Sequence, residues 1–226
     1  MIDPYYKEGA IEIYCGKTEE VAPSLGRRFG VNLTDPPYGI GSWSTTGGNS
    51  ITEAEAKEIN QWDTAPTPET FSMLLKLAKY SIIWGGNYFD LGRCRAPLIW
   101  DKGQRGMHFA DGEMAWTNFD FGTLRIFNLH VAAAGTKGQR YHPTQKPVGL
   151  MKWCLQFVKQ ESLELGILDA YMGSGTTLVA AKEMGLPAVG IEGNPRHCDQ
   201  AIDRLRQASL FSGRAGQTVS QIRIFE

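Results

Sequence analysis

The 226-residue chain lacks the features that mark membrane-spanning and exported proteins. It has no run of the roughly 18 apolar residues that cross a bilayer. Residues 1–6 have neither the basic start nor the apolar core of a signal peptide. The four cysteines lie far apart and form no Cys-x-x-Cys pair, which argues against a zinc site and a disulfide framework. We therefore expect reduced thiols, no metal, no membrane contact and a cytoplasmic location.

The chain also lacks a large excess of charge of either sign, with 23 Lys and Arg against 24 Asp and Glu. This balance excludes a protein that coats nucleic acid through charge alone. The distribution is uneven, because residues 91–152 hold nine basic and four acidic side chains, whereas residues 1–90 hold seven and twelve. The basic middle third allows a local phosphate-binding surface, although a solvated surface would have the same pattern.

Short β-branched apolar runs alternate with helical patterns, and no repeat or low-complexity segment interrupts them. This alternation predicts a single α/β domain over residues 1–226. Two long loops are expected within it, at 39–66 and 128–141. The expected strands are residues 10–14, 31–34, 81–84, 97–100, 113–117, 124–129, 166–170 and 188–191. The expected helices are residues 19–25, 68–79, 147–160, 176–184 and 195–207, three of which begin at a proline.

A ligand-binding unit is predicted near the C-terminus. A buried strand at 166–170 leads into a turn with Gly173 and Gly175, then a helix from Thr176, and a second strand that ends in Glu192. Glycines allow the backbone to approach a ligand closely, and an acid at this spacing can accept hydrogen bonds from ribose hydroxyls. Neither a full Gly-x-Gly-x-x-Gly pattern nor a P-loop lysine is present. The unit therefore suits adenosine without a pyrophosphate, as in S-adenosylmethionine, although a plain tight turn has the same local pattern.

A second site is predicted where the strand at 31–34 ends in Asp35-Pro36-Pro37-Tyr38. Two prolines stiffen the backbone and so hold the Asp35 carboxylate, the Pro36 carbonyl and the Tyr38 ring in one geometry. A carboxylate and a carbonyl can accept the two hydrogens of an exocyclic amine and align its lone pair for methyl transfer. An aromatic ring offers a stacking face to a base that has left the duplex.

Taken together, these segments resemble the DNA amino-methyltransferases that modify adenine N6 or cytosine N4. Asp35-Pro36-Pro37-Tyr38 is similar to their catalytic motif, and residues 169–177 are similar to their cofactor loop. His142-Pro143-Thr144-Gln145-Lys146-Pro147 is similar to a further cofactor-binding segment. The resemblance implies a Rossmann-like methyltransferase domain with a seven-stranded sheet, permuted so that the catalytic motif precedes the cofactor motif. It also implies a bacterial or phage-encoded protein.

The resemblance implies roles for individual residues. Asp35, Pro36, Pro37 and Tyr38 would bind and align the target base. The residues that would bind S-adenosylmethionine are Asp169, Ala170, Tyr171, Gly173, Ser174, Gly175, Thr176, Glu192, Asn194, Thr144 and Lys146, the last two at its carboxylate. DNA contacts are expected from Lys137, Arg140 and Arg105. Because the recognition loop at 128–141 is short, a homodimer is expected to extend the contact with DNA.

Two departures from the family pattern bear on the cofactor. Asp169-Ala170-Tyr171 replaces the usual Asp-Pro-Phe, so the Tyr171 hydroxyl needs a hydrogen-bond partner. Gly16-Lys17 replaces a usual Gly-Asp, which points to backbone recognition of adenine near Cys15.

The aspartate at the first catalytic position favours adenine N6 as the target, with cytosine N4 as the first alternative. An RNA adenine methyltransferase and a non-catalytic protein that binds S-adenosylmethionine or DNA are further alternatives. Cytosine C5 chemistry is disfavoured, because it needs a Pro-Cys nucleophile that the chain lacks.

Overall fold

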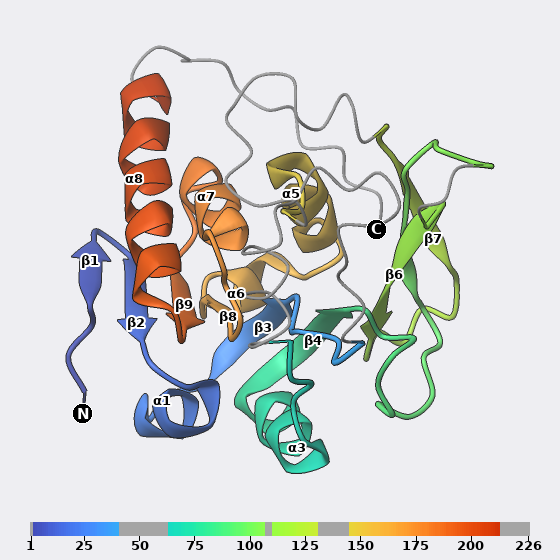
Figure 1. Cartoon of the computed structure of the whole chain (residues 1–226), viewed down its shortest axis with the longest axis horizontal. Coiled ribbons are helices and arrows are strands. Elements are labelled where there is room, and N and C mark those ends of the chain that lie inside the picture. Colours follow the sequence, from blue (N-terminus) through green and yellow to red (C-terminus); the bar gives the residue numbers. More distant parts are fainter. Residues whose placement is uncertain (1, 41–62, 107–109, 131–144, 213–226) are drawn as a thin grey trace.

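The computed structural model describes residues 2–40, 63–106, 110–130 and 145–212, the last four of these by backbone alone. Within these residues, one sheet has nine strands in the order β1-β2-β9-β8-β3-β4-β6-β5-β7 (Figure 1). The strands are β1 (Tyr6–Glu8), β2 (Ile11–Cys15), β3 (Phe29–Thr34), β4 (Ala78–Trp84), β5 (Leu98–Asp101), β6 (Gly112–Thr117), β7 (Arg125–Asn128), β8 (Ile167–Asp169) and β9 (Ala188–Glu192).

The sheet is mixed. The five central strands β2, β9, β8, β3 and β4 are parallel, whereas β6 lies antiparallel between β4 and β5. All eight predicted strands are present, within a few residues of their expected ends. The resemblance implied seven strands, and the described residues form nine. The strand that the sequence pattern missed is β1, which a hairpin adds at the edge beside β2, and β7 pairs in parallel with β5 at the other edge.

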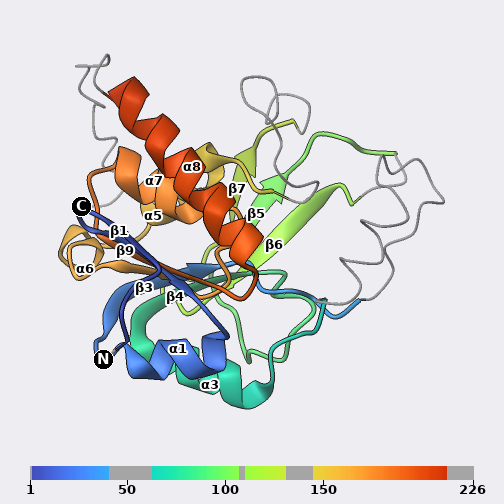
Figure 2. The same ribbon diagram turned by 60° about the vertical axis from the view of Figure 1, so that its left-hand side comes forward.

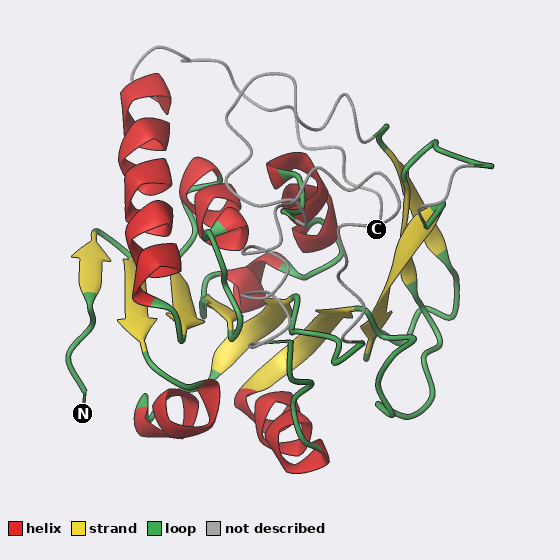
Figure 3. Cartoon of the chain, viewed as in Figure 1, coloured by secondary structure: helices red, strands yellow, loops and turns green. Residues whose placement is uncertain are grey.

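Helices cover both faces of the sheet, as Figures 2 and 3 show from two directions. The helices are α1 (Thr18–Ser24), α3 (Pro68–Leu77), α5 (Val148–Leu155), α6 (Gln160–Leu163), α7 (Thr176–Glu183) and α8 (Pro195–Ser212). α1 and α3 pack on one face, and α5 to α8 lie on the other. Successive side chains of a strand point to opposite faces of the sheet and so pack against different helix layers. Ile13 and Leu33 belong to the larger apolar cluster, and Tyr14 and Leu168 to the smaller one.

Three predicted helix ends were wrong. The helix expected at 195–207 continues to Ser212 as α8. The helix expected at 147–160 is two helices, because the chain turns after Leu155 and buries Val158 in the core before α6 begins at Gln160. The helix expected at 68–79 ends at Leu77, because Ala78 is extended and pairs with Phe29 as the first residue of β4. Tertiary pairing overrides the helical pattern in the last two cases.

The termini of α7 follow the predicted glycine positions. Gly175 has φ +77° immediately before Thr176, and a Cβ there would lie 2.7 Å from the Cβ of Ala201 in α8. At the other end, the amide of Gly185 donates to the carbonyl of Lys182, and that of Leu186 donates to Ala181. These two bonds form a Schellman motif, which ends the helix at Gly185.

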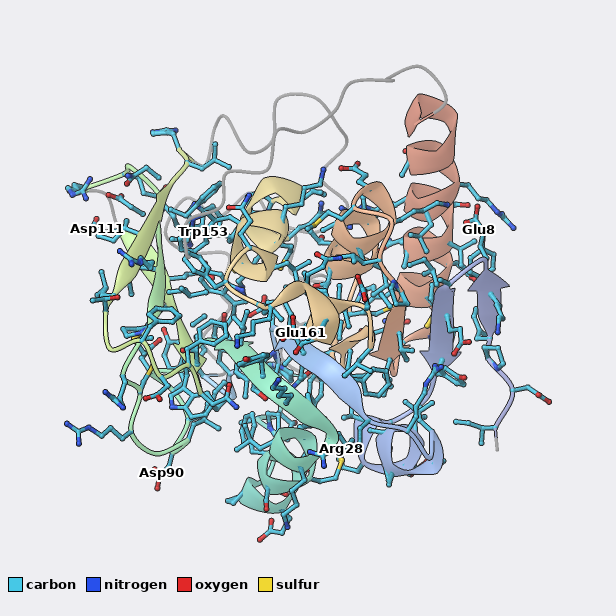
Figure 4. The ribbon with its side chains drawn as sticks, turned by 180° about the vertical axis from the view of Figure 1, so that it is seen from behind. Glu8, Arg28, Asp90, Asp111, Trp153 and Glu161 are labelled. Carbon is cyan, nitrogen blue, oxygen red and sulfur yellow. The ribbon has the colours of Figure 1, made fainter. Side chains whose placement is uncertain are left out.

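Figure 4 shows how side chains fill the space between the layers. Trp153 of α5 points toward the β7 end of the sheet, where its ring lies 5.4 Å from that of Phe127. Near the opposite edge, Glu8 of β1 and Lys182 of α7 form an ion pair with an N–O distance of 2.6 Å. The helix layer on this face is therefore tied to strands at both edges of the sheet.

Candidate active site

Two carboxylates lie at the ends of neighbouring strands in the middle of the sheet. Asp169 is the last residue of β8, and Asp35 follows Thr34, the last residue of the adjacent β3. The Thr34 hydroxyl donates to Asp169 Oδ1 at 2.9 Å. The backbone amide of Tyr171 donates to the Thr34 hydroxyl oxygen at 3.1 Å and to Asp169 Oδ1 at 3.2 Å. From β3 the chain proceeds to β4 on one side, and from β8 it proceeds to β9 on the other. Such a switch point is where parallel sheets bind ligands.

Asp169 is the more buried of the two carboxylates, with 4% of its surface exposed. Burial raises its pKa to about 7, even though hydrogen bonds from Thr177 and Thr34 favour the charged form. A buried carboxylate with this pKa is stabilised in its ionised form by a cationic group placed beside it. The position therefore suits the ammonium group of a ligand.

The glycine turn and Glu192 lie together, as the strand-turn-helix pattern predicts. Gly173 follows β8 with φ +51°, and its amide donates to Glu192 Oε2 at 3.0 Å. The other oxygen of Glu192 accepts from the Asn194 amide at 2.8 Å. The side chain of Asn194 accepts from the Arg196 amide and so caps α8. Glu192 thus joins the two loops that follow β8 and β9, and each oxygen keeps a lone pair for a further donor.

A buried arginine supports the same turn from α8. Arg204 Nη1 donates to the Ser174 carbonyl at 2.6 Å, to the Ser174 hydroxyl at 2.8 Å and to the Thr176 hydroxyl at 3.0 Å. The Ser174 hydroxyl also lies 3.4 Å from Gln145 Oε1. These contacts fix the start of α7. Sequence reasoning missed Arg204, because nothing in the local pattern of α8 indicates which face meets the turn.

The substituted Ala170-Tyr171 pair is accommodated by α1. The Tyr171 hydroxyl donates to Glu19 Oε1 at 3.2 Å, which supplies the partner that the sequence requires. The Thr70 hydroxyl donates to the same oxygen at 3.2 Å, and the Thr18 hydroxyl donates to the Ala170 carbonyl. Burial raises the pKa of Tyr171, and the nearby Glu19 carboxylate adds to this effect, so the phenol stays neutral.

The Asp35 segment forms a second group of contacts. Pro36 is buried and Pro37 is partly exposed, and the Tyr38 hydroxyl donates to Asp35 Oδ1 at 2.7 Å. Lys146 donates to Asp35 Oδ2, and its Nζ lies 3.3 Å from the Tyr38 hydroxyl oxygen. Lys146 was expected at the carboxylate of a cofactor, and the structure brings it to Asp35 instead. Its contact with a cofactor stays a prediction.

Two charged residues of this group were not predicted. Glu113 of β6 lies 3.0 Å from Lys146 Nζ through Oε2 and pairs with Lys102 through Oε1. Burial would raise the pKa of Glu113, but Lys146 and Lys102 outweigh it and lower the pKa to about 2. Burial would lower the pKa of Lys146, but Asp35 and Glu113 raise it well above its ordinary value. Lys102, Glu113, Lys146 and Asp35 therefore form a row of alternating charges, here called the charge row.

The Tyr38 ring is enclosed by aromatic side chains from the segment after β4. Tyr88 stacks on it with a centroid distance of 4.8 Å and an angle of 20°, and Phe89 meets it edge-on at 6.0 Å. Gly85 has φ +73°, and a Cβ there would lie 2.2 Å from the Tyr38 ring. Only glycine allows this approach. Tyr88 remains 49% exposed, so a stacked aromatic ring lies partly open to solvent beside Asp35.

The predicted DNA contacts are placed only in part. Lys137 and Arg140, as well as Thr144, lie outside the described residues, as does most of both long loops. Three basic side chains of residues 91–130 pair with carboxylates, namely Arg95 with Asp120, Lys102 with Glu113 and Arg105 with Asp101. The expected free basic surface is therefore partly neutralised. Lys102 belongs to the charge row and is largely buried, whereas Arg105 stays 68% exposed at its side chain.

Two kinds of feature are absent from the part of the chain that the structure describes. No group of three or more His, Cys, Asp or Glu side chains among them could hold a metal ion. None of the helices they form has the length and apolar character needed to cross a membrane.

Known proteins are similar to this chain over part or most of its length. The DNA methylase family of the N6/N4 type matches residues 99–203. The chain is therefore similar to the N6/N4 DNA methylase family over these residues. The type II methyltransferase M.HindIII of Haemophilus influenzae is 38% identical over 88 residues, which are 39% of this chain and 28% of that protein. M.ScaI of Streptomyces caespitosus is 24% identical over 92% of this chain and 86% of its own length.

Solved structures show the same fold. The M1.HpyAVI–SAM complex covers 86% of this chain and 99% of its own, with a TM-score of 0.55 and 19% identity. The PvuII DNA methyltransferase, described as cytosine-N4-specific, covers 93% and 94%, with a TM-score of 0.60 and 13% identity. The predicted Rossmann-like methyltransferase fold, with the Asp35 segment before the glycine turn, is thus present in this chain.

Proposed function

We propose that this protein transfers a methyl group from S-adenosylmethionine to the exocyclic N6 amine of an adenine in DNA. The observation that carries the proposal is the pair of carboxylates at the switch point, where Thr34 joins the ends of β3 and β8. One carboxylate, Asp169, suits a cationic cofactor, and the other, Asp35, suits an amine that is to be methylated. Their adjacency brings donor and acceptor together.

The residues around Asp169 fit this cofactor by their chemistry. Asp169 is a buried anion whose raised pKa favours a neighbouring ammonium, and Glu192 keeps lone pairs for ribose hydroxyls. No lysine or arginine follows the glycine turn before Lys182, which accords with a ligand without phosphates. When bound, the cofactor supplies a methyl group activated on a sulfonium. Asp169, Gly173 and Glu192 would hold and orient it.

Asp35 and the Pro36 carbonyl would accept the two hydrogens of the target amine. Both Asp35 oxygens already accept one donor each, from Tyr38 and Lys146, but each has a second lone pair for an incoming amine. The amine nitrogen is then free to attack the methyl carbon, and the proton that it loses after transfer passes to Asp35 or to water. Alignment and electrostatics supply the catalysis in this scheme.

Tyr38 would stack on the flipped base. Its exposed partner Tyr88 now covers one face of the ring at 4.8 Å, a distance that also suits a stacked base. We propose that the base takes the place of Tyr88 on Tyr38, or enters between the two rings, when it leaves the duplex. Lys137, Arg140 and Arg105 would hold phosphates nearby, and a homodimer would enlarge that contact.

Adenine is preferred to cytosine as the target because aspartate stands at the first catalytic position, as the family pattern implies. The test is incubation of the protein with duplex DNA and methyl-labelled cofactor, followed by nucleoside analysis. The expected product is N6-methyladenine. N4-methylcytosine would replace the adenine assignment by the cytosine alternative, and no labelled DNA would refute the activity. An Asp35→Ala variant should bind cofactor but transfer about 100- to 1000-fold more slowly.

A further inference from the structure

Lys146 lies between two carboxylates and a phenol that come from two other segments of the chain. Its ammonium group donates hydrogen bonds to Asp35 Oδ2 and, at 3.3 Å, to the Tyr38 hydroxyl oxygen, and it forms an ion pair with Glu113 Oε2 at 3.0 Å. The side chain is 5% exposed. A lysine has four rotatable bonds, so one contact with Asp35 alone would leave its position weakly defined. Glu113 supplies the second charged contact.

Glu113 reaches this site from the antiparallel part of the sheet. It pairs with Trp100 across β5 and β6, and Lys102 lies over the Trp100 ring at 5.1 Å while it pairs with Glu113. Glu113 is therefore held from the outer side by Lys102 and presents its other oxygen to Lys146. A buried carboxylate with a pKa of about 2 stays ionised at any pH at which the enzyme works.

The charge row also balances the electrostatics of the proposed reaction. Its two carboxylates and two ammonium groups sum to zero. Without the charge of Glu113 the row would carry one net positive charge, and the proposed cofactor brings another. Like charges in a site of low dielectric constant oppose each other strongly. Glu113 thus allows a lysine to contact Asp35 without repelling a cationic methyl donor.

We propose that Glu113 is a positioning residue for methyl transfer, which holds Lys146 against Asp35 and compensates its charge. This inference rests on the proposed function. Glu113 does not contact the target amine in this scheme but acts through Lys146. Removing its charge should therefore slow the transfer step and leave the cofactor contacts at Asp169 and Glu192 in place. Residues that hold a functional group from behind typically contribute about 10- to 100-fold, so we expect the rate of methyl transfer to fall by about that factor.

The test compares single-turnover methyl transfer and cofactor affinity in Glu113→Gln, Glu113→Asp, Lys146→Met and the Glu113→Gln/Lys146→Met double variant. Glu113→Gln should be about 10- to 100-fold slower than wild type, with cofactor affinity within about twofold. Glu113→Asp keeps the charge and should recover most of the rate. When Lys146→Met is already present, adding Glu113→Gln should lower the transfer rate little further, because the partner of Glu113 is already absent.

The matched control is Glu183→Gln, which removes a carboxylate that pairs with Lys152 at 2.6 Å away from the site. This variant should transfer at the wild-type rate. The inference is overturned if Glu113→Gln keeps the wild-type rate, if its loss is fully additive with Lys146→Met, or if cofactor affinity falls in parallel with the rate. If Glu113→Gln does not fold, Glu113→Asp decides alone through its rate. A wild-type protein that methylates no DNA would instead refute the proposed function.

Discussion

Asp169→Asn should separate the cofactor role of this residue from its effect on stability. The pKa of Asp169 rises from 3.8 to about 7 on burial. One pKa unit corresponds to about 1.4 kcal/mol, so holding the ionised form in the fold costs about 4 kcal/mol at pH above 7. The folded protein keeps a proton that the unfolded chain releases between about pH 4 and pH 7. The free energy of unfolding therefore has its full value, as far as Asp169 is concerned, below about pH 4, and it falls by about 4 kcal/mol as the pH rises to about 7.

The amide variant keeps the shape and an acceptor for Thr34, but it has no charge to bury. In urea unfolding without cofactor, the stability of Asp169→Asn relative to wild type should rise by about 2–4 kcal/mol between about pH 4 and pH 8. The difference between variants cancels the titration of all other groups. An equal difference at both pH values would refute the burial argument.

The same residue should make cofactor binding depend on pH. The ammonium group of the cofactor needs the ionised carboxylate, of which roughly a tenth is present one unit below the pKa. Affinity should therefore fall about eightfold from pH 7.5 to pH 6 in wild type. Asp169→Asn should bind the cofactor weakly at both pH values. A wild-type affinity that is constant across this range would place the cofactor ammonium elsewhere.

Three further changes test other parts of the site. Glu192→Gln should lower cofactor affinity, measured by titration calorimetry, by roughly 10- to 100-fold, because a charge-assisted hydrogen-bond acceptor is lost. Unchanged affinity would argue against the ribose contact. Tyr88→Ala should uncover Tyr38 and tighten binding of DNA with 2-aminopurine at the target position by about 2- to 10-fold. Weaker binding would mean that Tyr88 holds the base. Lys137→Ala with Arg140→Ala should flatten the log–log salt dependence of DNA binding by up to about two, whereas an unaltered slope would move the DNA-binding surface elsewhere.

The parts of the site that were predicted from sequence are those with local patterns. Asp35 follows β3 and Asp169 ends β8, and the glycines between β8 and α7 are visible in the sequence as a turn. The carboxyl ends of parallel strands meet at one edge, so these predictions combined into one site. The resemblance to a family added the chemistry, and the fold agrees with it.

The contacts of Glu113 with Lys146 and Lys102, and of Tyr88 with Tyr38, were not predicted, because they depend on long-range packing. β6 follows β5 in the chain but lies between β4 and β5 in the sheet. Nothing local to residues 112–117 indicates that insertion, so a carboxylate on β6 has no sequence signal for its contact with Lys146. The same applies to the end of the helix at Leu155, which depends on the burial of Val158.

The strand order has a consequence for synthesis of the protein on the ribosome. β8 and β9 are made last of the nine strands, yet they lie in the sheet between β2 and β3, which are made early. A nascent chain therefore exposes two unpaired strand edges until residues 167–192 have emerged. Such edges invite pairing with other chains. Fragments divided between β7 and α5 should accordingly be poorly soluble when made alone, and should gain solubility when they are made together.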